Sequence, residues 1–232
     1  MSTIEQPAVD AGEKLDFKKI LPLFVIILVD LLGLTIIIPL LPLYSVAMGA
    51  SPFVIGLLAA TYPLMQLVGG PVLGGLSDRF GRKPILMVSQ IGTFIGFVIL
   101  GFATTLPWLF ISRFIDGISG ANIVVAQAAI TDSTTEKTRT QGLGLLGAAF
   151  GLGFVIGPAI AGIALAVTDN NYRVPAFIAA GFSLLSIILT RFWFRETLTE
   201  DKREQEKASD GPSGFFHTVS QTVKSPLIVI LL

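Results

Sequence analysis

Residues 74–84 read Gly74-Gly75-Leu76-Ser77-Asp78-Arg79-Phe80-Gly81-Arg82-Lys83-Pro84, a short charged block between two long apolar runs. Residues 52–76 before it and residues 84–112 after it carry no charged side chain. Each run is long enough to cross a hydrocarbon core of roughly 30 Å as a helix. We therefore predict a tight turn at a membrane surface, in which glycine permits the turn and Pro84 suits the start of the next helix. Three of the four charges in the block are basic, which favours the cytoplasmic side.

The composition indicates a polytopic membrane protein. The chain is 52% hydrophobic and 14% charged, with a mean hydropathy of +0.77, whereas a soluble domain averages about 25% charged residues. There are no cysteines, the single His217 lies in a polar stretch, and no phosphate-binding GxxxxGK[ST] motif is present. We therefore expect no cofactor, no metal site and no nucleic-acid partner.

The apolar pattern predicts an all-α bundle of six spans over residues 20–194. Residues 1–19 form a polar N-terminal segment, residues 195–224 a charged linker, and residues 225–232 the start of a seventh helix. We expect this chain to be the first half of a larger protein; the alternative is a six-helix protein that dimerises. The predicted spans are 20–43, 52–76, 84–103, 106–131, 140–167 and 174–194.

The distribution of lysine and arginine predicts the orientation. Basic residues are frequent in residues 1–19, in the turns after the second and fourth spans, and in the linker. Residues 44–51 and 103–107 contain none. The N-terminus and the linker should therefore both lie on the cytoplasmic side.

Three ionisable residues fall inside the predicted spans: Asp30, Arg113 and Asp116. A charge near the bilayer centre costs about 2.5–3.5 kcal/mol even on insertion scales, so each needs a partner or a water-filled cavity. One interpretation is that Asp30 binds and releases a proton, because desolvation favours its neutral form and a nearby arginine favours its ionised form. The alternative is a permanent Asp30–Arg113 or Arg113–Asp116 pair that only holds helices together.

Helical spacing predicts the neighbours of these charges. On a continuous helix, Arg113, Asp116, Gly120, Val124 and Gln127 would share one face and could line a cavity, while Asn122 would point elsewhere. Hydrogen bonds between packed helices are an equally good explanation for the amide side chains. The candidates for contact with a substrate are Gln66, Asn122 and Gln127.

The fifth span is rich in glycine. The pairs Gly147/Gly151 and Gly153/Gly157 have the small-xxx-small spacing that lets a neighbouring helix approach closely. Pro158 removes a backbone donor and should bend the helix. The groove could be a moving contact between two halves of a protein, or static packing.

Four motifs lie in order on the predicted spans and together cover essentially all of residues 20–194. They are Leu32-Gly33-x5-Pro39-x-x-Pro42, Gly74-x-Leu76-x-Asp78-Arg79-x-Gly81-Arg82-Lys83, Arg113-x-x-Asp116-Gly117-x-x-Gly120-Ala121, and Gly153-x3-Gly157-Pro158-x-x-Ala161-Gly162. They resemble the signature motifs of the major facilitator superfamily, in particular of its drug:proton antiporters. Within that superfamily the sequence is similar to the tetracycline-efflux and multidrug-resistance group. Where tetracycline pumps carry an acidic residue in helix 3, this chain has Gly96, which favours a generic drug or metabolite exporter.

The resemblance implies the N-terminal half of a twelve-helix fold, with two inverted three-helix repeats in each half. It also implies that the charged block is a cytoplasmic gate: Asp78 and Arg82 would form a charge cluster with Asp132, and Asp78 would face a helix N-terminus in the missing half. The alternative is that the basic residues only determine topology. The gate residues are Gly74, Asp78, Arg79, Gly81, Arg82, Lys83 and Asp132.

The function that these features predict is proton-coupled efflux of small amphipathic molecules by alternating access, in the plasma membrane. Protonation of Asp30 and binding of substrate would compete or alternate, and the substrate would cross unchanged, so no enzyme activity is expected. One alternative is a uniporter or symporter for sugars or organic acids. Another is a truncated six-helix membrane protein with a role other than transport.

Overall fold

The computed structural model describes residues 15–199, and every regular element in that part of the chain is an α-helix. Most of the predicted N-terminal segment, most of the linker and the predicted start of a seventh span lie outside the described residues. Within residues 15–199, six spans are long and apolar enough to cross a membrane, one of which consists of two shorter helices. The prediction of an all-α, multi-pass bundle is confirmed. The helices are α1 (Phe17–Ala47), α2 (Pro52–Phe80), α3 (Arg82–Phe102), α4 (Leu106–Ser119), α5 (Asn122–Ser133), α6 (Arg139–Val167) and α7 (Arg173–Phe192).

The turn between the second and third spans is narrower than we predicted. Helix α2 continues through Phe80, so Gly74, Asp78 and Arg79 are helical rather than part of a loop. Only Gly81 separates α2 from α3, and its φ of 109° lies in the region that favours glycine. One residue with positive φ is enough to reverse the chain, so the charged side chains can occupy regular helix ends.

The fourth span departs from the prediction of one continuous helix. Helix α4 ends at Ser119 and α5 begins at Asn122, so the helix is broken at Gly120 and Ala121. Glycine in a helix interior costs about 1 kcal/mol relative to alanine. This cost makes the helix less stable at Gly120, but it does not by itself explain why the helix is broken there.

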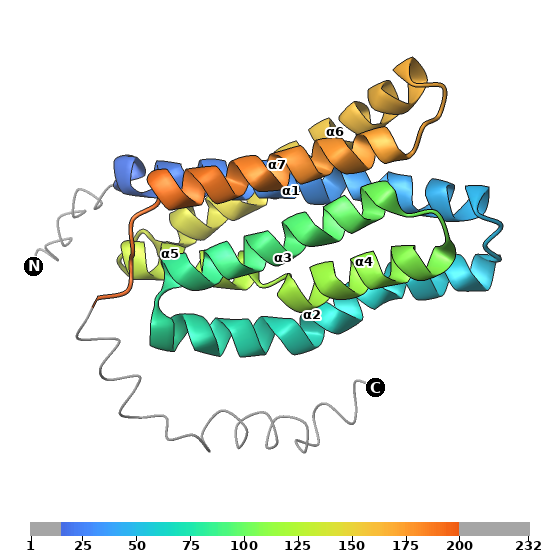
Figure 1. Cartoon of the computed structure of the whole chain (residues 1–232). Coiled ribbons are helices and arrows are strands. Elements are labelled where there is room, and N and C mark those ends of the chain that lie inside the picture. The colour runs from blue at the N-terminus through green and yellow to red at the C-terminus, as the bar shows by residue number, and fades with distance from the viewer. Residues whose placement is uncertain (1–14, 200–232) are drawn as a thin grey trace, which may run out of the picture.

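The helices pack as two interlocked triplets (Figure 1). The first triplet is α1, α2 and α3; the second is the α4/α5 span, α6 and α7. The most extensive interfaces are α3 with α7, α1 with α6, α1 with α7, α3 with α4, and α2 with α4. Exchanging the two triplets maps this set of interfaces onto itself. Since each triplet crosses the membrane three times, the second is inverted relative to the first, as the resemblance to the major facilitator superfamily implied.

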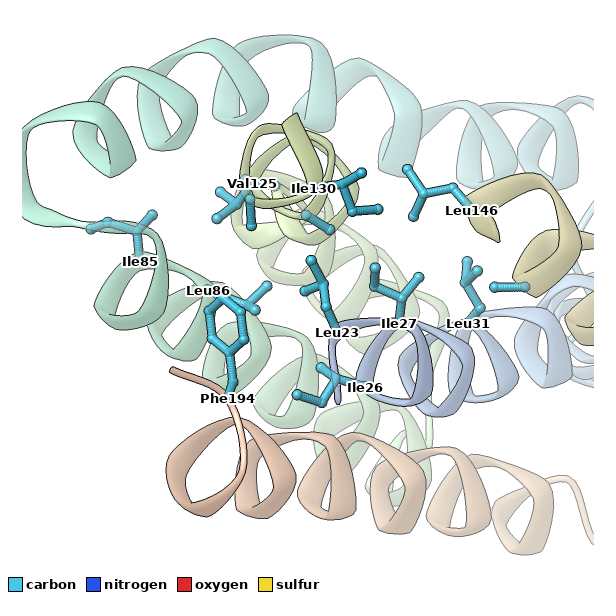
Figure 2. Packing of buried hydrophobic residues seen from close by; sticks show 14 residues of the cluster. Leu23, Ile26, Ile27, Leu31, Ile85, Leu86, Val125, Ile130, Leu146 and Phe194 are labelled. Atoms are coloured by element: carbon cyan, nitrogen blue, oxygen red, sulfur yellow. The ribbon is translucent and has the colours of Figure 1, made fainter. Parts of the chain in front are cut away.

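Two apolar clusters fill the inside of the bundle. One lies at the end where α1 and α3 begin and α7 ends; it combines side chains of α1, α3 and α5, and Figure 2 shows Phe194 beside Leu86 of α3. The other surrounds Phe97 and Leu100, nearer the opposite end. Large apolar side chains also cover the outer surface: Leu67, Val155 and Phe192 are all more than 70% exposed. An apolar exterior is what a hydrocarbon environment requires.

Candidate functional site

The break in the fourth span has its backbone groups paired. The side-chain amide of Gln66 on α2 donates from Nε2 to the Gly120 carbonyl over 2.6 Å. The Ser89 hydroxyl on α3 accepts from the Ala121 backbone N–H over 3.1 Å and donates to the Ser119 carbonyl. Non-helical backbone at membrane depth is tolerated only when such partners are present. The sequence analysis missed Ser89 altogether. For Gln66 it left open contact with a substrate or a hydrogen bond between packed helices, and the structure contains a hydrogen bond between helices.

Glycine lets α2 approach α4 closely beside the break. A Cβ at Gly69 would lie 2.7 Å from the carbonyl carbon of Ile118, and a Cβ at Gly117 would lie 2.6 Å from the Tyr62 carbonyl oxygen. No real Cβ makes contacts that short, so both positions require glycine. This close approach brings Gln66 within reach of Gly120.

The break also turns Asn122 toward Asp30. Asn122 is the first residue of α5, and its Nδ2 donates to Asp30 Oδ2 over 2.6 Å. The prediction that Asn122 points away from the other polar residues is therefore wrong, because it assumed a continuous helix. The second carboxylate oxygen, Oδ1 of Asp30, is buried without a hydrogen-bond partner among residues 15–199, and so is Oδ1 of Asn122.

Two small cavities meet at the Asp30–Asn122 pair. One is lined in part by Leu86 and Gln90 of α3, and the other by Tyr62, Gln66 and Asp116. Both include Asp30, Leu31, Asn122 and Ile123 in their walls. The pair is therefore a partition between the two cavities. Within the described part of the chain, no group of three His, Cys, Asp or Glu side chains could hold a metal ion.

Arg113 pairs with Asp116, within α4 itself. The two charged groups approach to 3.0 Å, and the residues are 2% and 1% exposed. The guanidinium also lies over the Phe97 ring, 5.5 Å from its centroid. Of the two ion pairs considered from the sequence, the structure contains Arg113–Asp116.

The predicted polar face of the fourth span is not formed. Val124 and Gln127 on α5 are exposed, whereas Arg113 and Asp116 on α4 are buried between helices. The break at Gly120 changes the helical phase between the two segments, so the 3.6-residue spacing does not extend across it. Gln127 alone of the predicted amides faces outward from this half of the bundle.

The predicted cluster around Arg82 is present at one end of the bundle. Arg82 donates from Nε to Asp132 Oδ2 over 2.9 Å, forms a second ion pair with Asp78, and donates to the Ser77 hydroxyl over 2.8 Å. Its side chain is only 8% exposed. The three charges that the sequence analysis grouped therefore meet. Asp78 remains 39% exposed, so it retains surface for a further contact.

A third acidic residue, Glu196, joins this end and was missed. Its carboxylate accepts from the backbone N–H groups of Arg82 and Lys83 at 2.9 and 3.0 Å, and so caps the first turn of α3. Lys83 in turn donates from Nζ to the carbonyls of Arg191 and Phe194, at and just beyond the end of α7. The N-terminus of α3 thus faces a carboxylate and the C-terminus of α7 faces an ammonium group, and each charge has the sign that the helix dipole favours. The only available signal was an acidic residue just after the last span, and spacing alone does not place it beside Gly81.

The glycines of α6 divide into two groups. A Cβ at Gly157 would lie 2.7 Å from Thr35 Cβ on α1, and one at Gly153 would lie 3.4 Å from Leu31 Cβ. This pair is static packing against α1. At Gly147, Gly151 and Gly162, a Cβ would meet no described residue within 4 Å, so these glycines leave an open surface.

The family model described as "Major Facilitator Superfamily" matches residues 23–232. The chain belongs to the major facilitator superfamily. This membership accounts for the paired triplets and for the charged cluster at the turn between α2 and α3. The resemblance that the four sequence motifs indicated is thus confirmed.

Curated relatives place the chain near the drug-resistance members of the superfamily. It is 37% identical over 212 residues to the class B tetracycline resistance protein of Escherichia coli, covering 89% of this chain and 52% of that protein. It is 33% identical over 202 residues to multidrug resistance protein 1 of Bacillus subtilis (strain 168), covering 87% and 51%. The chain thus spans about half the length of the curated relatives it matches.

A solved structure has the same fold. The human organic anion transporter MFSD10 (TETRAN) aligns with a TM-score of 0.70 at 23% identity, covering 82% of this chain and 50% of that one. At that identity the match shows the fold alone. Together with the family match, it supports a half-transporter architecture for the described helices.

Proposed function

We propose that residues 20–194 form the N-terminal half of a proton-driven exporter of small amphipathic drugs or metabolites. It would work by alternating access in the plasma membrane, with the N-terminus and the linker of residues 195–224 on the cytoplasmic side. The substrate crosses unchanged, so the protein is not an enzyme. Residues 225–232 would begin the seventh of twelve helices.

The observation that carries this proposal is the environment of Asp30. An ionisable residue inside a membrane span indicates function by default, because its burial is costly. One oxygen of this carboxylate has a single amide donor and the other has no partner in the described structure, at the junction of two cavities. A structural carboxylate would be fully paired. The similarity to tetracycline and multidrug resistance proteins supports export as the direction.

The other intramembrane residues take supporting roles. The Arg113–Asp116 pair sets the electrostatic field beside Asp30, since Asp116 lines one of the same cavities. Gln66 holds the break in the fourth span, and Gln127 faces outward, where a substrate could contact it. We assign Asp30 to proton binding and the Arg113–Asp116 pair to proton coupling.

The cluster of Asp78, Arg82 and Asp132 would latch the cytoplasmic side, with the exposed part of Asp78 facing the second half. Helices α2 and α6 support the presence of a second half. Only 17% and 28% of their most apolar segments are buried, compared with 56% for α1. The missing half would cover these two helices, including the open glycine surface of α6.

Everted vesicles that contain the complete transporter test the proposal. Adding substrate should discharge a preformed proton gradient, and Asp30→Asn should abolish that response while the protein still inserts. Asp169→Asn, which makes the same chemical change in an exposed loop, is the matched control. Full substrate-driven proton movement in Asp30→Asn would refute the role of Asp30. Substrate uptake that runs with the proton, rather than against it, would favour the symporter alternative.

A further inference from the structure

Among residues 15–199, Asn122 is the side chain that donates a hydrogen bond to the Asp30 carboxylate, from Nδ2 to Oδ2 over 2.6 Å. Its own acceptor, Oδ1, is buried and has no partner among the described residues. The Asn122 amide therefore has a hydrogen-bonded donor and an acceptor without a partner, and the Asp30 carboxylate beside it also has one oxygen without a partner. A buried polar atom without a partner costs about 1–3 kcal/mol, so two of them in one pair require an explanation.

The ionisable groups around Asp30 do not supply the missing partner. Tyr62 on α2 and Asp116 on α4 line the adjoining cavity, and Arg113 is committed to Asp116. Asp116 is itself acidic, so it cannot compensate an ionised Asp30. The cavity on the other side contributes Gln90 of α3. Its Nε2 donates to Ser186 on α7 over 2.6 Å, and its Oε1 is also buried without a partner among the described residues. Of the side chains lining both cavities, only Asn122 forms a hydrogen bond with Asp30 in this structure.

We propose that Asn122 is a positioning residue that serves both protonation states of Asp30 through its two amide atoms. When Asp30 is ionised, it accepts from Nδ2 of Asn122, as the structure shows. When a proton binds to a carboxylate oxygen, the new O–H group needs an acceptor, and rotation of the amide presents Oδ1. The hydrogen bond to Nδ2 is broken and one to Oδ1 is formed, with the proton supplied by water.

The break in the fourth span makes this exchange possible. Asn122 is the first residue of α5, so its position depends on the turn at Gly120 and Ala121, whose backbone groups are paired by Gln66 and Ser89. The amide is held at its backbone while its side chain borders two cavities. Such a site can reorient an amide without moving a helix. This inference rests on the proposed proton role of Asp30 and adds the group that stabilises each of its states.

Infrared titration of the purified protein in lipid vesicles tests the inference without any transport assay. The C=O stretching band of protonated Asp30 is identified as the band that Asp30→Asn removes. Asn122→Leu keeps the size but removes both amide atoms, so each protonation state of Asp30 loses one hydrogen bond. The bond to the ionised carboxylate is the stronger of the two, so the titration midpoint should move upward, but by less than the loss of the donor alone would give. The band should also move to higher wavenumber, because the protonated carboxyl loses its acceptor.

Gln127→Leu is the matched control, since it removes an exposed amide from the same helix. It should leave both the midpoint and the band position as in the wild type. Asn122→Ala replaces Asn122→Leu if far-UV circular dichroism shows that the leucine variant loses its helices. A midpoint and a band position that both stay unchanged in a folded Asn122 variant would overturn the inference, and so would an absent Asp30 band between pH 4 and 10. An altered titration without proton-coupled transport would leave the inference standing and sink only the proposed function.

Discussion

The contact between Gly69 and Ile118 gives the sharpest test of the fold around the site. Replacing Gly69 with alanine adds one methyl group, whose carbon would lie 2.7 Å from the Ile118 carbonyl carbon and 2.9 Å from its Cα. Carbon atoms in contact prefer separations of about 3.5–4.0 Å, so α2 and α4 must move apart by about 1 Å. Neither partner can rotate away, because the atoms that the methyl group meets are backbone.

The neighbouring residue provides the reference for the magnitude. Alanine at Gly70 would place its Cβ 3.8 Å from Val124 Cγ2, an ordinary contact. Both substitutions gain the same helix propensity, about 1 kcal/mol, so this gain cancels in a comparison. Overpacking costs about 1–3 kcal/mol, and a displacement of 1 Å also breaks the Gln66–Gly120 hydrogen bond, worth about 0.6 kcal/mol in a membrane protein. Gly69→Ala should therefore be less stable than Gly70→Ala by about 2–4 kcal/mol.

The assay is reversible unfolding in mixed micelles of increasing SDS content, followed by far-UV circular dichroism, with the free energy of unfolding as the readout. Gly70→Ala should unfold at the same or a slightly higher SDS fraction than the wild type, and Gly69→Ala at a clearly lower one. If the two variants agree within about 0.5 kcal/mol, a typical limit for substitutions without a named structural cause, the close approach of α2 to α4 at this level is wrong.

Three further substitutions test the charged groups. Glu196→Gln should lower the free energy of unfolding by about 1 kcal/mol, because a charged cap on α3 becomes neutral. The control is Glu136→Gln, in the exposed turn before α6. It should leave the free energy of unfolding unchanged in the same SDS titration. Asp116→Asn should lower the free energy of unfolding by about 3–5 kcal/mol, because it leaves Arg113 buried and unpaired. The double variant Arg113→Met/Asp116→Leu should lower it by less, because both charges are removed. Equal losses in the two variants would show that the two charges are not coupled. In the complete transporter, Asp78→Asn should impair efflux. Labelling of single introduced cysteines should show that the topology is unchanged. Normal efflux in this variant would mean that the charged block only determines topology.

The sequence predicted those features that depend on local composition. The spans follow from runs of apolar residues, and the cluster of Asp78, Arg82 and Asp132 was implied by the resemblance of the charged block to the signature motif of the major facilitator superfamily. Asp30 could be singled out because a carboxylate in an apolar run stands out against its neighbours. Each of these signals is contained in a few adjacent residues or in a recognisable motif.

The features that sequence reasoning missed depend on contacts between distant residues. The break at Gly120 exists because Gln66 and Ser89, on two other helices, pair the backbone groups that it frees. A glycine in a helical stretch does not reveal whether such partners are within reach. The same applies to Glu196, which lies 114 residues from the Arg82 backbone N–H that it caps. Helical periodicity failed for Asn122 and Gln127 for this reason, since it assumes that the phase is kept.

The break connects the packing of the bundle to its chemistry. Gly69 and Gly117 let α2 lie directly against α4, so that Gln66 reaches the Gly120 carbonyl. Because that carbonyl is paired, α5 can begin rotated relative to α4. This rotation directs Asn122 toward Asp30. If the fourth span were a continuous helix, Asn122 would face away, and Asp30 would have no donor from this span. Gly69 on α2 and Gly117 on α4 therefore do more than allow close packing. They permit the backbone geometry on which the environment of the intramembrane carboxylate depends, so a substitution such as Gly69→Ala should alter the titration of Asp30 as well as the stability of the fold.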